Sequence, residues 1–193
     1  MNVVLFDSSE ADQNSLCLSD QRARHIVSVL KLKADDEVRI GAINGRLGVG
    51  RVQTVAHDAK SGRFDVRLEI KRLDEESPPK SSIELILALP RPKSLRRCLR
   101  MIANLGIKSV HLIHSSRVEK SYWSTPFLDH QSMRASLLEG LAIARDTVLP
   151  EVKIYKLFKP FVQDVAPSLI HTYGYVAHPS SHLQQAISKP IAP

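Results

Sequence analysis

Residues 83–113, IELILALPRPKSLRRCLRMIANLGIKSVHLI, contain the pattern that decides the fold. Residues 83–89 are a short apolar run typical of a buried strand, and residues 110–113 predict a second strand. Between them, Ser94 is a candidate helix N-cap and Gly106 a candidate helix end. Because a strand, a helix and a strand at this spacing form a parallel, right-handed unit, we expect an α/β layer structure here.

The alternation of helix and strand patterns continues toward the C-terminus. Residues 129–145 predict a helix, which Pro150 prevents from extending further. Residues 152–155 and 173–177 predict two more strands, and residues 158–168 form a proline-containing connection that could hold a short helix. The helical spacing of the 129–145 segment is carried by four apolar residues: Met133, Leu137, Leu141 and Ala144.

The N-terminal part has the pattern of a β-rich domain. Apolar and polar residues alternate over residues 38–42 and again over 64–70, and Asn44-Gly45 is a hairpin turn signal. These segments predict strands of a small barrel. One helix interrupts them, with Asp20 as its candidate N-cap. We expect its buried side to carry Ile26, Val29 and Leu30, and its exposed side to carry Arg22, Arg24 and Lys31.

A break in composition separates these two regions. Residues 73–82, LDEESPPKSS, combine charges with a pair of prolines, which cannot continue a packed element. The sequence therefore predicts an α+β protein of two domains, a β-barrel over residues 1–73 and an α/β domain over residues 82–193.

Composition excludes several classes of protein. Hydrophobic residues make up 43% of the 193 residues, which is enough to fill a core. The sequence has no apolar run near the roughly 20 residues that a spanning helix needs, and its N-terminus has no basic leader. The two cysteines lie far apart, and the histidines lack metal-ligand spacing. We therefore expect a cytoplasmic protein with neither a membrane nor a metal partner.

The chain is basic, with a net charge of +7 and a pI near 9.6. This balance favours a polyanionic partner, although an ordinary basic surface explains it equally well. Five cations, with no acid among them, occupy the start of the predicted helix in the second domain: Arg91, Lys93, Arg96, Arg97 and Arg100. This strip could hold a phosphate backbone, aided by the helix N-terminus, or it could be a solvated helix face.

A second polar group, HSSRVEKSYW, occupies residues 114–123, directly after the second strand of the α/β region. Ligands of parallel sheets collect beyond the carboxyl ends of the strands, so a site is expected in this loop. Arg117 and Lys120 could bind phosphate, and Tyr122 or Trp123 could stack on a base. Alternatively, Trp123 anchors the loop to the core while the charged side chains stay exposed.

Four segments, in this order, resemble the ribosomal RNA uridine-N3 methyltransferases of the SPOUT superfamily. They are HIVSVLK (25–31), LGI (105–107), SSR (115–117) and RDTVLPEV (145–152). The pair His178-Pro179 also resembles a His-Pro pair of that family. The resemblance implies a PUA-like, RNA-binding β-barrel followed by a knotted, Rossmann-like α/β SPOUT domain that binds S-adenosylmethionine and forms a homodimer.

The resemblance also implies roles for single residues. His25 and Lys31 would contact RNA. Charge alone adds the neighbouring Arg22 and Arg24 and the strip Arg91, Lys93, Arg96, Arg97 and Arg100 to the RNA-binding candidates. Arg117 and Arg145 would be catalytic or RNA-positioning residues. His178 and Pro179 would line the cofactor pocket. The implied reaction is methyl transfer to uridine N3 of 16S ribosomal RNA, in the small ribosomal subunit.

The sequence departs from the family pattern in three places. Ala142-Ile143 stand where the family usually has Glu-Gln, and Met101 and Asn104 replace a frequent Lys and Glu. The chain ends at Pro193, where the family continues into a Gly-Pro-Glu-Gly-Gly loop and a later Leu-Gly-x-Arg-Ile-Leu-Arg stretch. We therefore expect a SPOUT domain truncated at its C-terminus, with an incomplete site that binds S-adenosylmethionine weakly or not at all.

Three functions are compatible with these features. The first is a uridine-N3 methyltransferase that is active only with the missing segment supplied. The second is a non-catalytic RNA-binding module or degenerate paralogue. The third, which has less support, is an α/β enzyme that acts on an acidic small molecule.

Overall fold

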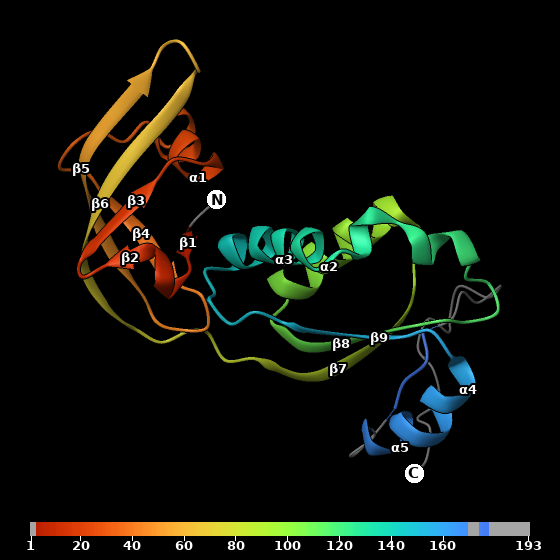
Figure 1. The fold of residues 1–193 in the computed structure, drawn as a ribbon. Helices are drawn as coiled ribbons and strands as arrows, with labels where there is room; N and C mark the ends of the chain where they lie inside the picture. Colours follow the sequence, from red (N-terminus) through yellow and green to blue (C-terminus); the bar gives the residue numbers. More distant parts are fainter. Residues whose placement is uncertain (1–2, 170–173, 178–193) are drawn as a thin grey trace, which may run out of the picture.

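The computed structural model describes residues 3–169 and 174–177 of the chain. Two sheets lie side by side, a curled one formed by the N-terminal part and a parallel one with helices α2 and α3 on one of its faces (Figure 1). Residues 76–80 connect the last strand of the first sheet to the first strand of the second.

The curled sheet is a six-stranded half-barrel with the order β1-β4-β5-β6-β3-β2. β1 pairs with β4 in parallel, and the other neighbours are antiparallel. Its strands are β1 (Val4–Phe6), β2 (Ala11–Asp12), β3 (Ser15–Leu18), β4 (Glu37–Ala42), β5 (Leu47–Asp58) and β6 (Arg63–Glu75). Its short helices are η1 (Ser8–Glu10), α1 (Gln21–Arg24) and η2 (His25–Val29).

Most of the elements predicted for this part are confirmed. Residues 38–42 and 64–70 lie in β4 and β6, and Asn44 adopts a left-handed conformation (φ 59°) in the turn between β4 and β5. Asp20 caps α1 by accepting a hydrogen bond from the N–H of Arg22 at 2.8 Å.

The expected buried side of the first helix was only partly right. Ile26 is fully buried, but Val29 is 62% exposed and Leu30 is 37% exposed. The reason is that α1 ends at Arg24 and continues into the π-helical turn η2. A π turn contains an extra residue, so the residues after it no longer follow the 3.6-residue period on which the prediction rested.

The second sheet has the order β7-β8-β9, and both strand pairs are parallel, which confirms the α/β prediction. Its strands are β7 (Ser81–Ala88), β8 (Ile107–Ile113) and β9 (Glu151–Tyr155). The helices between them are α2 (Pro92–Asn104), η3 (Lys120–Ser124), η4 (Pro126–Leu128) and α3 (His130–Ala144). After β9 come three short helices, α4 (Phe158–Pro160), η5 (Phe161–Val165) and α5 (Ala166–Leu169).

Three details of this prediction were wrong. α2 begins at Pro92 with Arg91 as its N-cap, not at Ser94, because proline is well suited to the first helical position. β7 is not buried on both faces: Leu85 and Leu87 pack against the core under the helices, whereas Ile83 is 59% and Ile86 39% exposed.

Of the predicted strand 173–177, Tyr173 lies outside the described residues. Gly174 forms an isolated bridge, and residues 175–177 are exposed and form no strand.

The predicted helix over 129–145 is confirmed as α3. Asp129 caps it, and Arg145 ends it in the left-handed conformation (φ 56°). α3 packs closely on α2 at Gly140, where an added Cβ would lie 2.2 Å from the backbone oxygen of Arg100. This approach is possible only with glycine at this position.

The two sheets share a hydrophobic core. Val3, Leu5 and Leu47 of the curled sheet belong to the same buried cluster as Leu95 and Leu141 of the helices. Hydrogen bonds between the β4–β5 turn (44–45) and residues 147–149 also join the two sheets. We call the whole contact between the two sheets, apolar and polar, the seam. The N–H of Asn44 donates to the Thr147 carbonyl at 2.8 Å, and the Asn44 side-chain oxygen accepts from the N–H of Leu149 at 2.9 Å. The sheets are therefore joined by packing as well as by the linker.

Replacing Gly140 by alanine should destabilise the protein by about 1–3 kcal/mol, because the new methyl group forces the backbones of α2 and α3 apart. The measurement is chemical denaturation followed by circular dichroism. Gln131→Ala, an exposed change in the same helix, is the control and should stay within about 0.5 kcal/mol of the parent. Equal stability of both variants would show that the helices are not in close contact.

Candidate functional site

A cleft of about 540 Å³ lies between the two domains. Its apolar part includes Leu5 and Ile43 from the curled sheet and Leu138 and Ala142 from α3. Asp7, Glu10, Asp20, Arg22 and Glu139 bring charged groups to the same cleft. The cleft is therefore apolar between the domains and has charged groups from both of them.

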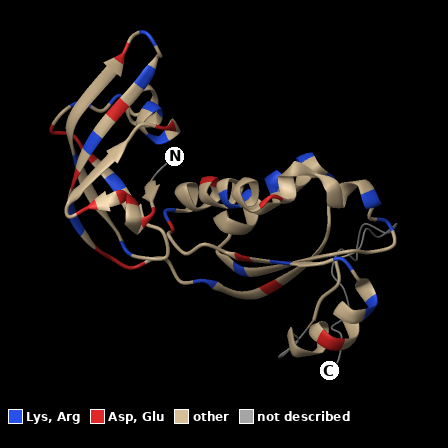
Figure 2. Cartoon of the chain, in the orientation of Figure 1, with Lys and Arg blue, Asp and Glu red and all other residues tan. Residues whose placement is uncertain are grey.

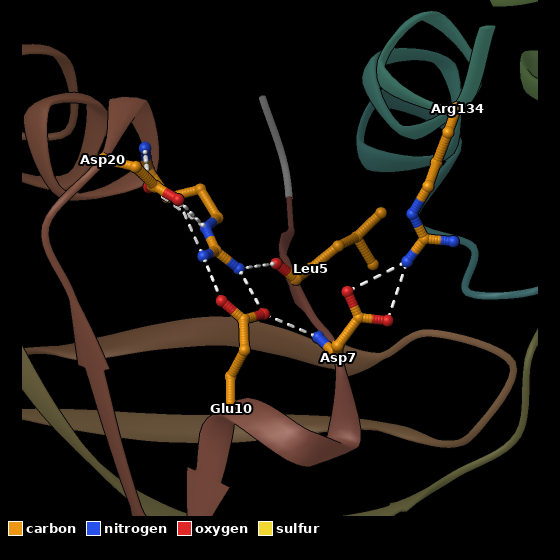
Figure 3. Close-up of polar contacts among 6 residues, drawn as sticks. Leu5, Asp7, Glu10, Asp20 and Arg134 are labelled. Carbon is orange, nitrogen blue, oxygen red and sulfur yellow. Dashed lines mark hydrogen bonds and ion pairs between the residues drawn. The ribbon is translucent and has the colours of Figure 1, made fainter. Parts of the chain in front are cut away.

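Arg22 is the centre of the polar network at this cleft, and Figure 3 labels its partners Leu5, Glu10 and Asp20. Its guanidinium donates to the Leu5 carbonyl at 2.9 Å and pairs with Glu10 at 2.5 Å and with Asp20 at 2.7 Å. Glu10 also accepts the N–H of Asp7 at 2.7 Å. One cation thus ties together β1, η1 and the start of α1.

Arg22 lowers the pKa of both carboxylates. The hydrogen bond from Arg22 lowers the pKa of Glu10 below its ordinary value of 4.5. Burial opposes the ionisation of Asp20, but the hydrogen bonds from Arg22 outweigh it and lower the pKa of Asp20 below 3.8. Both groups are therefore carboxylates near neutral pH.

A second ion pair crosses the cleft. Arg134, on α3, donates to both carboxylate oxygens of Asp7, at 2.7 and 2.9 Å (Figure 3). Asp7 follows β1 directly, so this pair links the curled sheet to the α/β layer. Sequence reasoning did not identify it, because its members are separated by 127 positions and neither belongs to a motif.

The first domain's RNA-binding candidates differ in their surroundings. Arg22 is occupied by the internal bonds described above, and His25 lines the cleft and is half-buried. Arg24 and Lys31 are exposed, and Lys31 has a left-handed backbone (φ 57°). The structure therefore leaves Arg24 and Lys31 as the outward-facing cations of this group.

Two of the five cations in the basic strip of α2 contact other side chains of the chain. Arg91, Lys93, Arg96 and Arg97 are exposed, and Figure 2 colours the Lys and Arg positions of the helical layer blue. Arg100 pairs with Glu139 of α3 at 2.5 Å, and the Arg96 guanidinium lies over the ring of Phe127 at 5.6 Å. Residues 91–100 contain no acidic residue. In the folded chain, however, Glu139 of α3 lies at the end of this strip.

The loop after β8 is anchored by its aromatic residues. Trp123 donates its indole N–H to His114 at 2.9 Å, and the Tyr122 hydroxyl donates to Glu119 at 3.0 Å. Both rings pack against the shared core, which supports the anchoring alternative. Arg117 and Lys120 remain exposed.

The two candidate catalytic arginines lie at opposite ends of the sheet. Arg117 follows the carboxyl end of β8, whereas Arg145 precedes the amino end of β9, which runs parallel to β8. Arg145 is exposed, and the next residue, Asp146, is buried and paired with Lys80 of the linker. Within one chain, Arg117 and Arg145 therefore do not converge.

The proposed pocket residues His178 and Pro179 lie outside the described residues. Within residues 3–169 and 174–177, His, Cys, Asp and Glu form no group that could hold a metal ion. None of the helices in that part of the chain is long and apolar enough to cross a membrane.

Two family models match the sequence. The model described as an RNA methyltransferase domain matches residues 76–191, and the model described as an RNA methyltransferase PUA domain matches residues 18–61. The ribosomal RNA small subunit methyltransferase E of Treponema pallidum is 32% identical over 163 residues, which are 83% of this chain and 59% of that protein. This chain thus spans about three fifths of the length of that relative.

Solved structures share the fold. A "probable rRNA-methyltransferase" from Porphyromonas gingivalis aligns with a TM-score of 0.63 at 16% identity, over 84% of this chain and 64% of that one. The ribosomal RNA small subunit methyltransferase E of Neisseria gonorrhoeae, solved with S-adenosyl methionine bound, aligns with a TM-score of 0.56 at 17% identity. That alignment covers 79% of this chain and 61% of the other.

Replacing Arg22 by methionine should destabilise the protein at neutral pH by about 1–3 kcal/mol, because it leaves the Leu5 carbonyl and two carboxylates without their partner. Since Arg22 lowers the pKa of both carboxylates, their ionic contribution is present above the ordinary values of 4.5 and 3.8. It is lost as the pH falls through the lowered values. The difference in unfolding free energy between the parent and Arg22→Met, measured by denaturation across this pH range, should therefore shrink as the pH falls.

The control for this experiment is Arg63→Met, because Arg63 forms an exposed pair with Asp65 on β6. Its loss should cost less than about 1 kcal/mol. A difference between Arg22→Met and the parent that stays constant into acid would contradict the assigned role of Arg22.

Proposed function

This chain belongs to the RNA methyltransferase family, and on that premise we propose that it serves S-adenosylmethionine-dependent methylation of uridine N3 in 16S ribosomal RNA. The family match over residues 76–191 carries the proposal. The name of the Treponema pallidum relative supports ribosomal RNA of the small subunit as the substrate class, and the resemblance to the SPOUT methyltransferases supports N3 as the target atom. A cytoplasmic location and a homodimer, which that resemblance implies, complete the proposal.

The proposed RNA surface lies at the carboxyl edge of the parallel sheet. Arg91 and Lys93 follow the end of β7, and Arg117 and Lys120 follow the end of β8. These four side chains are exposed, and the N–H of Leu89 donates to the Ile113 carbonyl at 2.9 Å, which keeps the two strand ends together. Cations at one edge of a sheet suit a phosphate backbone, because each contact releases counterions.

The reaction requires uridine N3 to lose its proton. S-adenosylmethionine, when bound, supplies the electrophilic methyl group, and we assign His178 and Pro179 to its pocket. Arg117 is suited to stabilise the negative charge that develops on the base. An arginine cannot act as the general base at neutral pH. Arg145, at the other end of the sheet, is then assigned a role in positioning RNA.

One observation favours the alternative of a non-catalytic RNA-binding module or degenerate paralogue. At the two positions where the resemblance expects Glu-Gln, Ala142 is buried in the cleft and Ile143 is 48% exposed. Neither side chain can donate or accept a hydrogen bond. A polar pair that would help to arrange the site is thus replaced by apolar residues.

Methyl transfer to uridine N3 is tested with labelled S-adenosylmethionine and small-subunit RNA, followed by nucleoside analysis. Because this chain spans about three fifths of the Treponema pallidum relative, the assay uses this chain and a fusion of it to the remaining segment of that relative. We expect N3-methyluridine from the fusion. Label at another atom, or no label while the relative itself is active, would contradict the proposed reaction and favour the non-catalytic alternative.

RNA binding by the carboxyl edge and the adjoining first turns of α2 is tested by replacing Arg91, Lys93 and Arg97 together with glutamine. The affinity for single-stranded RNA should fall, and the slope of log K against log salt should become shallower by about 2, since up to three phosphate contacts are lost. The measurement is fluorescence anisotropy across a salt series. A charge-matched control replaces Lys71, Lys108 and Lys153, which lie on three different strands. A control that changes the slope as much would show that only total charge matters.

A further inference from the structure

We propose that the outer half of the β5–β6 hairpin, residues 53–65, is an arm that binds single-stranded RNA by stacking a base on the His57–Phe64 pair. We call this segment the stacking arm. The inference rests on the proposed RNA-binding function and adds a second contact surface to it, at the other end of the molecule from the carboxyl edge.

The stacking arm extends beyond the rest of the curled sheet. β4 pairs with β5 only as far as Arg51, and β3 pairs with β6 only from Val66 onward. β5 and β6 nevertheless remain paired to their ends, at Asp58 and Arg63. The outer part is therefore a two-stranded ribbon that projects past its neighbours, on the side of the parallel sheet that carries α2 and α3 (Figure 1).

Apart from Phe64, this projection contributes little to the core. Residues 53–60 are all exposed, and a two-stranded ribbon is at best marginally stable in water by itself. The ribbon must therefore be held by its own cross-strand contacts. Their geometry shows what surface the arm offers to a partner.

The main cross-strand contact is a stacked ring pair. His57 and Phe64 lie directly opposite each other in the β5–β6 register. Their ring centroids are 4.6 Å apart and their planes differ by 23°. Phe64 is half-buried against the inside of the sheet, whereas His57 is exposed. The supported, exposed imidazole is a flat surface on which an unpaired base can continue the stack.

The tip of the arm is pre-organised by Asp58. Its carboxylate accepts the N–H of Lys60 at 2.9 Å and the hydroxyl of Ser61 at 2.6 Å. The N–H of Gly62, which has a positive φ of 66°, donates to the Asp58 carbonyl at 2.8 Å. The turn therefore has a defined shape before any partner binds.

One cation lies next to the ring pair. Lys60 is exposed in the turn, whereas Arg63 and Arg67 alternate with Phe64 along β6 and therefore lie on the opposite face of the ribbon, where the Arg63 Nε donates to Asp65 at 3.2 Å. Among the described residues, Lys60 forms no ion pair, so its exposed ammonium is open to a phosphate. A ring platform beside a cation is the combination that single-stranded nucleic acid binds, whereas duplex RNA hides its base faces.

The test uses a fluorescein-labelled, single-stranded oligouridine of about 10 nucleotides and a duplex of the same length. Phe64→Leu keeps an apolar side chain but removes the ring that supports His57. We expect the affinity for the single strand to fall about 5- to 10-fold, and the salt slope to stay unchanged because no charge is lost. Binding of the duplex should change little.

Three further variants control for damage to the fold. Phe64→Trp keeps a ring, so it should retain the parent affinity, and its added fluorescence should be quenched by the single strand. His57→Ala should weaken binding as Phe64→Leu does. Val55→Ala, on the same ribbon, should leave binding unchanged.

The outcomes separate this inference from the proposed function. If the Arg91, Lys93 and Arg97 variant loses affinity while Phe64→Leu and His57→Ala bind as the parent does, RNA binding stands and the stacking arm is refuted. If the unmodified chain shows no salt-sensitive RNA binding, the proposed function itself falls. Loss of binding in Phe64→Trp equal to that in Phe64→Leu would also refute stacking.

Discussion

The seam between the two domains is the constraint on which the other features depend. Val3, Leu5 and Leu47 of the curled sheet lie in the same core as the helices of the α/β layer, and the Asn44-Gly45 turn is hydrogen-bonded to residues 147–149. Apolar side chains in a shared core cannot separate without exposure to water, which is unfavourable in proportion to the area exposed. The cleft, the carboxyl edge and the stacking arm therefore keep fixed relative positions.

The charges at the seam are largely internal, in contrast to those at the carboxyl edge. Arg22 pairs with Glu10 and Asp20, and Arg134 pairs with Asp7. Arg22 joins elements of the first domain, and Arg134 joins the two domains. Both cations are already paired, so they add little attraction for a phosphate. Arg91, Lys93, Arg97 and Arg117 are exposed. The chain has a net charge of +7, and the cations that can attract a polyanion are mainly those whose side chains are exposed and unpaired.

Local periodicity was sufficient to predict β4, β6, the parallel strands β7, β8 and β9, and the helices α2 and α3, but not β1, β2, β3 or β5. Asp20, Asn44-Gly45 and Gly106 are local signals for caps and turns, and all three have those roles. The π turn at residues 25–29 leaves no such signal, so the exposure of Val29 could not be predicted.

Contacts between distant segments also could not be predicted from the sequence pattern. The pairing of Arg100 with Glu139 depends on how α2 packs on α3, which Gly140 decides. The His57–Phe64 pair depends on the register of a hairpin whose turn, Lys60-Ser61-Gly62, was not recognised as one. Charge and resemblance were enough to name the candidate RNA-binding residues. Only the structure shows which of them are exposed and which are engaged in internal contacts.

Photo-crosslinking of the chain to single-stranded RNA, followed by peptide mapping, tests most directly whether the seam holds the stacking arm and the carboxyl edge on one rigid body as two RNA-binding surfaces. The account predicts crosslinks in both residues 53–65 and residues 91–100, obtained from one-to-one complexes. Crosslinks confined to the face of the β7-β8-β9 sheet opposite α2 and α3, or to neither segment, would contradict it.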